Sequence, residues 1–189
     1  MTIQIDDAGV GDLLHGVVVG AYRVETGEFR YDMIDVKFFQ ASKFHRKAYL
    51  VRASEIVMQI VDRMRLHENE AIQICSSFVL EKAVRDLEER YGKERVTVTK
   101  ITDGAQHFVE TAYLDELRNL GYEPLPEREE KRARSFFHML RWLKKDPRRF
   151  RHAKTGWPHL RGYLKPREQC SIHYDVSRRS LKYTSAGYR

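Results

Sequence analysis

The N-terminal stretch constrains the fold most, because an alternating apolar pattern there runs directly into two acids. Ile3 and Ile5 alternate with the polar Gln4, which is the pattern of a short β-strand with one buried face. Asp6 and Asp7 follow without a break. Because successive side chains of a strand point to opposite faces, we expect these acids to face opposite sides of a sheet or to splay at its edge.

Gly9 and Gly11 come directly after the acids, where they let the backbone turn sharply or let a ligand approach closely. Mg²⁺ and Mn²⁺ take oxygen ligands from carboxylates. The stretch therefore predicts part of a metal site at a glycine-lined edge of a sheet. In the alternative interpretation, Asp6 or Asp7 only caps a turn of its own backbone.

The remaining patterns predict an α/β fold. Three strand patterns come first and follow one another through short links, at 3–5, 16–22 and 29–39. Helical patterns at 49–66 and 78–91 then alternate with strand patterns at 71–75 and 95–102, and two helical patterns follow at 106–120 and 130–146. Short links favour antiparallel pairing, so we expect a mixed sheet with three leading antiparallel strands and flanking helices.

Charge is distributed unevenly along the chain. From Arg128 to the C-terminus there are 18 Lys and Arg against 5 Asp and Glu, a net charge of +13, whereas the preceding residues carry −6. A basic C-terminal third behind an acidic body is typical of a nucleic-acid partner, and the alternative is a solvated basic surface. We expect one domain over 1–150 and a basic extension over 151–189 that packs on the domain or trails from it.

Several classes of protein are disfavoured. The chain has no run of about 18 apolar residues, and acids stand near its N-terminus where a signal peptide has a basic and then an apolar segment. The two cysteines, Cys75 and Cys170, form no disulfide framework and have no metal-ligand spacing. We therefore expect no membrane segment and a reducing, cytoplasmic setting.

The order of the motifs resembles that of the type 2 ribonucleases H, within the ribonuclease H-like fold. That family opens on a strand and D-E-A-G-R-G, followed by a glycine and several valines. The same place in this chain reads D-D-A-G-V-G over 6–11, then Gly16 and three valines. The family's D-S-K element, at the entry to its first helix, corresponds to Ala41, Ser42 and Lys43.

Two later motifs complete the resemblance, which covers about 3–146. A family strand that ends in D-G corresponds to Asp103 and Gly104. The family's last acid lies five residues before a serine that begins an apolar helix, and Glu130 precedes Ser135 by the same spacing. No single motif is specific, and their shared order carries the resemblance.

The resemblance implies a catalytic domain over 1–150 that hydrolyses phosphodiester bonds, foremost those of RNA in RNA–DNA hybrids. It places Asp6, Asp7, Asp103 and Glu130 around two Mg²⁺ or Mn²⁺ ions. Asp6 and Asp103 are expected as direct ligands because each ends a central strand, with the other two acids positioning metal or water. The alternatives are an Asp-Gly turn at Asp103 and a first-turn acid favoured by the helix dipole at Glu130.

The resemblance also implies contacts with nucleic acid. The loop Gly9, Val10 and Gly11 is expected to read a ribonucleotide through its backbone, and Lys43 to approach a scissile-strand phosphate. Arg148, Arg149 and Arg151 are expected on a phosphate track of the basic third. The alternative for all four cations is an exposed position without a specific partner.

This chain departs from the family pattern at four positions. Asp7 is one methylene shorter than the family's glutamate, and Glu130 is one longer than its aspartate. Val10 replaces an arginine and Ala41 an aspartate, which removes two polar contacts. Two alternative functions follow: a ribonuclease H-like nucleic-acid-binding protein without turnover, or a nuclease of the same fold that acts on structured DNA.

Overall fold

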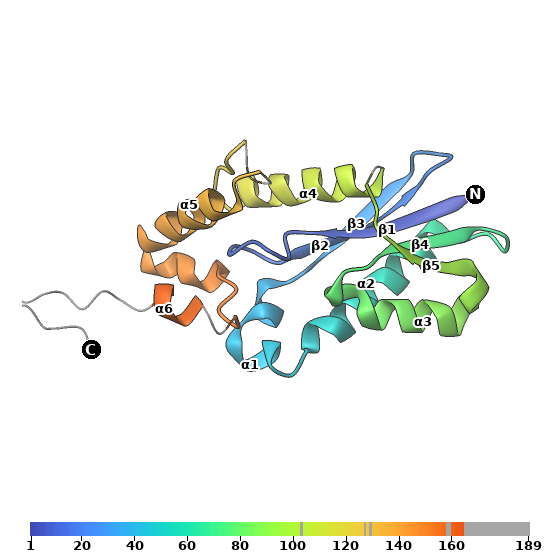
Figure 1. Cartoon of the computed structure of the whole chain (residues 1–189), viewed down its shortest axis with the longest axis horizontal. Helices are drawn as coiled ribbons and strands as arrows, with labels where there is room; N and C mark the ends of the chain where they lie inside the picture. The colour runs from blue at the N-terminus through green and yellow to red at the C-terminus, as the bar shows by residue number, and fades with distance from the viewer. Residues whose placement is uncertain (103, 127, 129, 158–159, 165–189) are drawn as a thin grey trace, which may run out of the picture.

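The computed structural model describes residues 1–102, 104–126, 128, 130–157 and 160–164. A five-stranded sheet in the order β3-β2-β1-β4-β5 forms its centre (Figure 1). The central strand β1 (Thr2–Ala8) pairs antiparallel with β2 (Val17–Arg23) and parallel with β4 (Ala71–Cys75). β3 (Phe29–Ile34) extends the antiparallel side and β5 (Val96–Thr99) the parallel side. The predicted mixed sheet with three leading antiparallel strands is confirmed.

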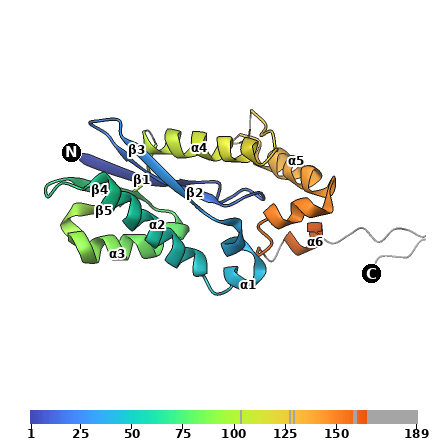
Figure 2. The same ribbon diagram turned by 180° about the vertical axis from the view of Figure 1, so that it is seen from behind.

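Helices cover both faces of the sheet (Figures 1 and 2). α2 (Ala48–Met64) and α3 (Glu81–Tyr91) lie on one face, and α4 (Ala105–Asn119) lies on the other. α5 (Arg132–Lys144) and the short α6 (Arg161–Leu164) lie beyond the end of the sheet, as Figure 1 shows. The short helix α1 (Ala41–Phe44) precedes α2. Short 3₁₀ helices span Val36–Phe39, Phe78–Leu80, Lys93–Arg95 and Pro147–His152.

The central strand is buried on both faces. Ile3 and Ile5 are fully buried in one apolar cluster with residues of α2 such as Ile56. Ala8 belongs to a second cluster together with Tyr113 of α4. Burial of each large aliphatic side chain contributes roughly 1.5–3 kcal/mol. The end of β1 that carries the two acids is therefore held from both sides.

Two expected strands are shorter than their apolar patterns suggest. The pattern over 29–39 predicts one strand, but β3 ends at Ile34. The Asp35 side chain accepts a hydrogen bond from the Lys37 amide at 2.8 Å and starts the 3₁₀ helix that follows. The strand expected over 95–102 spans only Val96–Thr99, and the 3₁₀ turn Lys93–Arg95 takes up its expected first residue.

The chain beyond residue 150 returns to the N-terminal loop. Ala153 forms an isolated β-bridge with Leu14, and the Lys154 amide donates a hydrogen bond to the Leu13 carbonyl at 2.9 Å. The Trp157 ring lies 5.3 Å from the Phe44 ring, centroid to centroid. Most of the extension expected over 151–189, with Cys170, lies outside the described residues.

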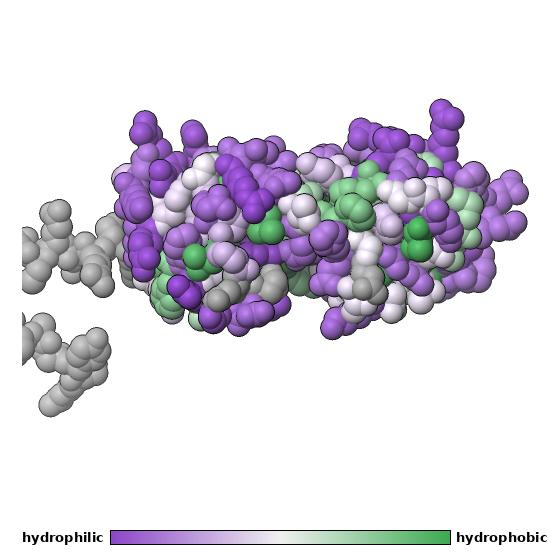
Figure 3. Space-filling view, turned by 90° about the horizontal axis from the view of Figure 1, so that it is seen from above, coloured by the Kyte–Doolittle hydropathy of each residue, from purple (hydrophilic) through white to green (hydrophobic). Residues whose placement is uncertain are grey.

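Seen from the side of α4, hydrophilic side chains predominate and apolar groups are scattered between them (Figure 3). Within the described ranges, none of the helices combines the length and apolar character needed to cross a bilayer.

Candidate functional site

Two acids and a thiol meet where the central strands end. The parallel register pairs Ile5 of β1 with Ile74 of β4, so that Asp6 and Cys75 are the next residues on adjacent strands. One carboxylate oxygen of Asp6, one of Asp7 and the Cys75 Sγ all lie within 4.8 Å of one another. We call these three residues the strand-end cluster.

The convergence of the two acids has a local cause. Side chains of adjacent strand residues ordinarily point to opposite faces. Here the ladder between β1 and β4 stops at Ile5 and Ile74, and the Asp7 amide donates a hydrogen bond to Oδ1 of Asp6 at 2.9 Å. The Asp6 carboxylate is thus held against the backbone amide of Asp7.

Burial makes both acids costly to ionise. Asp6 is 4% exposed, and this burial raises its pKa. Hydrogen bonds from the Cys75 thiol and the Asp7 amide lower the pKa of Asp6 but do not offset the effect of burial. The pKa of the half-buried Asp7 is raised to about 6, mainly by burial and further by the charge of Asp6. A hydrogen bond from Ser77 and the charge of Lys154 act in the opposite direction and lower this pKa. Two adjacent carboxylates in this environment favour either a shared proton or a bound cation.

Cys75 joins this site although its sequence spacing gave no indication of it. Burial, together with the hydrogen bond to Asp6 and the charges of both acids, raises the pKa of the Cys75 thiol to about 12. The thiol therefore keeps its proton at neutral pH. The position of Cys75 at the end of the strand pattern over 71–75 was the available signal, but only the pairing of β4 with β1 makes it informative.

The glycine loop after β1 depends on Gly9. Its φ is +89°, and a Cβ at this position would lie 2.3 Å from the Tyr113 ring. That ring is fixed because the Tyr113 hydroxyl donates a hydrogen bond to the Leu14 carbonyl at 2.9 Å. Gly11, in contrast, faces open space and its φ is not in the left-handed region. The sharp turn after the acids therefore requires Gly9, whereas Gly11 leaves an open surface.

A buried lysine supports the same loop. Lys154 is fully buried, and its Nζ donates a hydrogen bond to the Gly9 carbonyl. The Nζ lies 5.4 Å from the centroid of the Phe39 ring. Burial lowers the pKa of Lys154 to about 7, although the charges of Asp12 and Asp7 act in the opposite direction. Sequence reasoning counted this lysine only with the basic C-terminal third.

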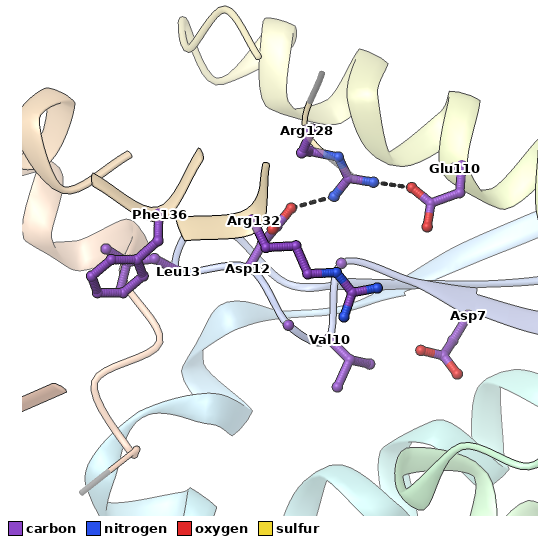
Figure 4. A pocket seen from close by; sticks show the side chains of 10 residues that line it. Asp7, Val10, Asp12, Leu13, Glu110, Arg128, Arg132 and Phe136 are labelled. Carbon is purple, nitrogen blue, oxygen red and sulfur yellow. Dashed lines mark hydrogen bonds and ion pairs between the residues drawn. The ribbon is translucent and has the colours of Figure 1, made fainter. Parts of the chain in front are cut away.

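A pocket of about 240 Å³ lies beside the loop. Its lining consists of Asp7, Gly9, Val10, Gly11, Asp12, Leu13, Glu110, Arg128, Arg132 and Phe136. Arg128, which is 7% exposed, donates hydrogen bonds to Asp12 and Glu110 and so joins the loop to α4 (Figure 4). The Arg132 side chain points toward the side of the pocket where Val10 and Asp7 lie (Figure 4).

The roles of the other two predicted acids are not decided by the described residues. Asp103 lies outside the described residues. Glu130 is exposed in the turn before α5, and the potential metal-binding group found within the described part of the chain contains only Asp6, Asp7 and Cys75. The roles of Asp103 and Glu130 therefore stay predictions.

The predicted nucleic-acid cations lie apart from the lining of the pocket. Lys43 of α1 is exposed, with its Nζ 5.1 Å from the centroid of the Phe38 ring. Arg148 is 86% exposed in its side chain and pairs with Asp146 at 3.0 Å. Arg149 packs over the Trp142 ring at 4.3 Å. Arg151 is exposed and donates a hydrogen bond to the His152 ring at 2.9 Å.

Comparison with known proteins gives structural matches alone. No protein-family model matches the sequence, and no curated protein matches it. The structure is similar to that of a glutamine-to-alanine mutant of Bst-RNase HIII, with a TM-score of 0.55 and 16% identity over 86% of this chain and 68% of that one. Bst-RNase HIII in complex with Mn²⁺ gives a TM-score of 0.53 and 15% identity over the same shares.

A third structure, of the PCNA:RNase HII complex from Archaeoglobus fulgidus, gives a TM-score of 0.44 with 16% identity over 78% of this chain and 89% of that chain. At these identities the likeness to the two RNase HIII structures establishes the fold. The fold expected from the motif order is confirmed: the chain has the ribonuclease H-like fold of an α/β protein.

Proposed function

We propose that this protein is a divalent-metal-dependent nuclease that hydrolyses phosphodiester bonds, with RNA in RNA–DNA hybrids as its foremost substrate. The observation that carries the proposal is the convergence of Asp6 and Asp7 at the end of the central strand. Asp7 also lines the pocket beside the glycine loop. A carboxylate pair thus lies next to a pocket that nucleic acid can approach.

The donor set fits Mg²⁺ or Mn²⁺. Both ions take carboxylate oxygens, and both acids here are buried enough that their pKa values are raised. A cation removes the cost of ionising them in this environment. When bound, such ions supply activation of water and stabilisation of the leaving oxygen. Asp6 and Asp7 would hold them, and Asp103 and Glu130 are the proposed further ligands.

The chain supplies two means of holding a substrate strand at this position. Gly11 faces open space on the wall of the pocket, so that a sugar–phosphate backbone can approach the loop without meeting a side chain. Arg132 of α5 lines the same pocket, and a guanidinium is a group that binds phosphate oxygens (Figure 4). Lys154 holds the loop in place because its Nζ donates a hydrogen bond to the Gly9 carbonyl.

The proposal is tested with three substrates in Mn²⁺: a uniform RNA–DNA hybrid, a DNA duplex that carries one ribonucleotide, and a plain DNA duplex. We expect cleavage of the hybrid, and its loss in Asp6→Asn. Asp62→Asn is the matched control, because Asp62 of α2 is an exposed acid that pairs with Arg90 of α3.

The outcomes separate the alternative functions. Equal rates on the hybrid and on plain DNA would refute the ribonuclease assignment and favour a nuclease that acts on DNA. Binding of nucleic acid without cleavage of any substrate, in protein that has bound Mn²⁺, would favour a nucleic-acid-binding protein without turnover.

A further inference from the structure

The strand-end cluster differs chemically from a purely carboxylate site. Cys75 is a free cysteine, partly exposed, and its Sγ lies within 4.8 Å of the ligand oxygens of both Asp6 and Asp7. We propose that Asp6, Asp7 and Cys75 form a mixed carboxylate–thiolate site that binds thiophilic divalent cations such as Zn²⁺ and Cd²⁺, and that these ions thereby displace Mg²⁺ or Mn²⁺ from the two acids.

The geometry is close to that of a coordinated ion. Zinc is held by thiolate sulfur at about 2.3 Å and by carboxylate oxygen at about 2.1 Å, which places the two ligand atoms roughly 3.6 Å apart in a tetrahedral site. Three ligand atoms within 4.8 Å of one another therefore need to shift by roughly 1 Å to close on one ion. Cys75 and Asp7 are both partly exposed, and rotation of their side chains is the movement that this closure requires.

The chemistry of the thiol separates the two classes of ion. Mg²⁺ takes oxygen ligands, so Cys75 keeps its proton beside Mg²⁺ and continues to donate a hydrogen bond to Asp6. A thiophilic ion forms a metal–sulfur bond as the S–H bond breaks, and the proton passes to solvent. Each ion bound in this way releases one proton from Cys75 and gains one soft ligand.

A separate opening reaches Cys75. A second pocket, of about 370 Å³, is lined by Cys75 with Ser76, Ser77 and Phe78 among others, whereas the pocket beside the glycine loop is lined by Asp7. The cluster thus borders two pockets, one on the side of the thiol and one on the side of the proposed substrate. Cys75 and Ser77 both line the second pocket, and the Ser77 hydroxyl, which hydrogen-bonds Asp7, is a further oxygen beside the cluster.

Binding is tested on the full chain by titration with Cd²⁺, followed by the ultraviolet charge-transfer absorbance of a cadmium–thiolate bond. The other cysteine, Cys170, provides the matched control. We expect an absorbance that saturates near one equivalent in the wild type and in Cys170→Ser and is absent in Cys75→Ser. Absorbance that persists in Cys75→Ser, or none in the wild type, would overturn the site. Thermal melts in metal-free buffer verify that Cys75→Ser is folded.

Displacement of the hard ion is measured without turnover. Mn²⁺ released from the protein is followed by electron paramagnetic resonance as Zn²⁺ is added. We expect Cys75→Ser to need at least tenfold more Zn²⁺ than the wild type for half release, and equal concentrations would refute the displacement. This arm rests on the proposed function, since it requires bound Mn²⁺. Absence of Mn²⁺ binding would contradict the nuclease and the displacement, while the cadmium absorbance would still decide the thiolate site.

Discussion

Replacing Asp7 with asparagine should stabilise the metal-free protein at neutral pH and have little effect near pH 4. The pKa of Asp7 is raised from 3.8 to about 6, chiefly by burial. Between these two values the folded chain holds a proton that the unfolded chain has released, so stability falls as the pH rises through this window. Above pH 6 the cost is complete, and at about 1.4 kcal/mol per pKa unit it amounts to roughly 2–3 kcal/mol.

The assay is urea unfolding of the wild type and Asp7→Asn in EDTA, at pH 4 and at pH 7.5. Asparagine carries no charge at either pH, so the variant should be more stable by roughly 2–3 kcal/mol at pH 7.5 and nearly equal at pH 4. Asp62→Asn, which alters an exposed acid paired with Arg90 of α3, should show no such gain at pH 7.5. An Asp7→Asn variant that is less stable than the wild type at pH 7.5, or equally shifted at both values, would refute the reasoning.

Divalent metal should cancel this effect. A ligand that binds only the folded state at 100 times its dissociation constant adds about 2.7 kcal/mol of stability. With saturating Mn²⁺ the wild type should therefore gain stability that Asp7→Asn does not. An equal gain in both proteins would place the ion elsewhere.

Three further predictions follow from the loop and the basic residues. Gly9→Ala should cost about 2–4 kcal/mol in chemical unfolding, because a Cβ there overlaps an aromatic ring and φ is +89°, whereas Gly11→Ala should leave stability unchanged. The pKa of Lys154 is lowered from 10.5 to about 7, so between these pH values the folded chain binds fewer protons than the unfolded chain. The wild type should therefore gain stability as the pH rises from 7 to 9.5, and Lys154→Met should abolish that gain, as measured by thermal melts at both pH values. The double change Arg148→Gln and Arg151→Gln should reduce the slope of log affinity for nucleic acid against log salt concentration, measured by fluorescence anisotropy. The expected reduction is about one unit for each phosphate that is no longer neutralised, and an unchanged slope would mean that these arginines form only a solvated surface.

The sheet was predictable because its signals are local. Ile3 and Ile5 alternate with a polar residue, and the valines after Gly16 form a continuous apolar run, so the strand periods are visible in short windows. The apolar pattern was misleading where a side chain hydrogen-bonds a backbone amide and so competes with strand pairing. Asp35 starts a 3₁₀ helix at a point where the apolar pattern continues as a strand.

The composition of the site was less predictable, because it depends on contacts between distant parts of the chain. Cys75 reaches the acids through the parallel pairing of β4 with β1, and no ligand spacing in the sequence encodes that pairing. Lys154 lies 145 positions from the carbonyl that it contacts. The two glycines have the same local sequence signal, and only the Tyr113 ring identifies Gly9 as the residue that the turn requires.

The most direct test of the central claim is a crystal structure of the full chain grown or soaked with Mn²⁺, with anomalous diffraction used to locate the ion. We predict an anomalous peak at roughly 2–2.5 Å from carboxylate oxygens of both Asp6 and Asp7, the range expected for a divalent ion on oxygen ligands. The same data collected from Asp6→Asn should lack that peak. Occupied Mn²⁺ sites found only elsewhere on the molecule would contradict the assignment of these two acids as the metal site.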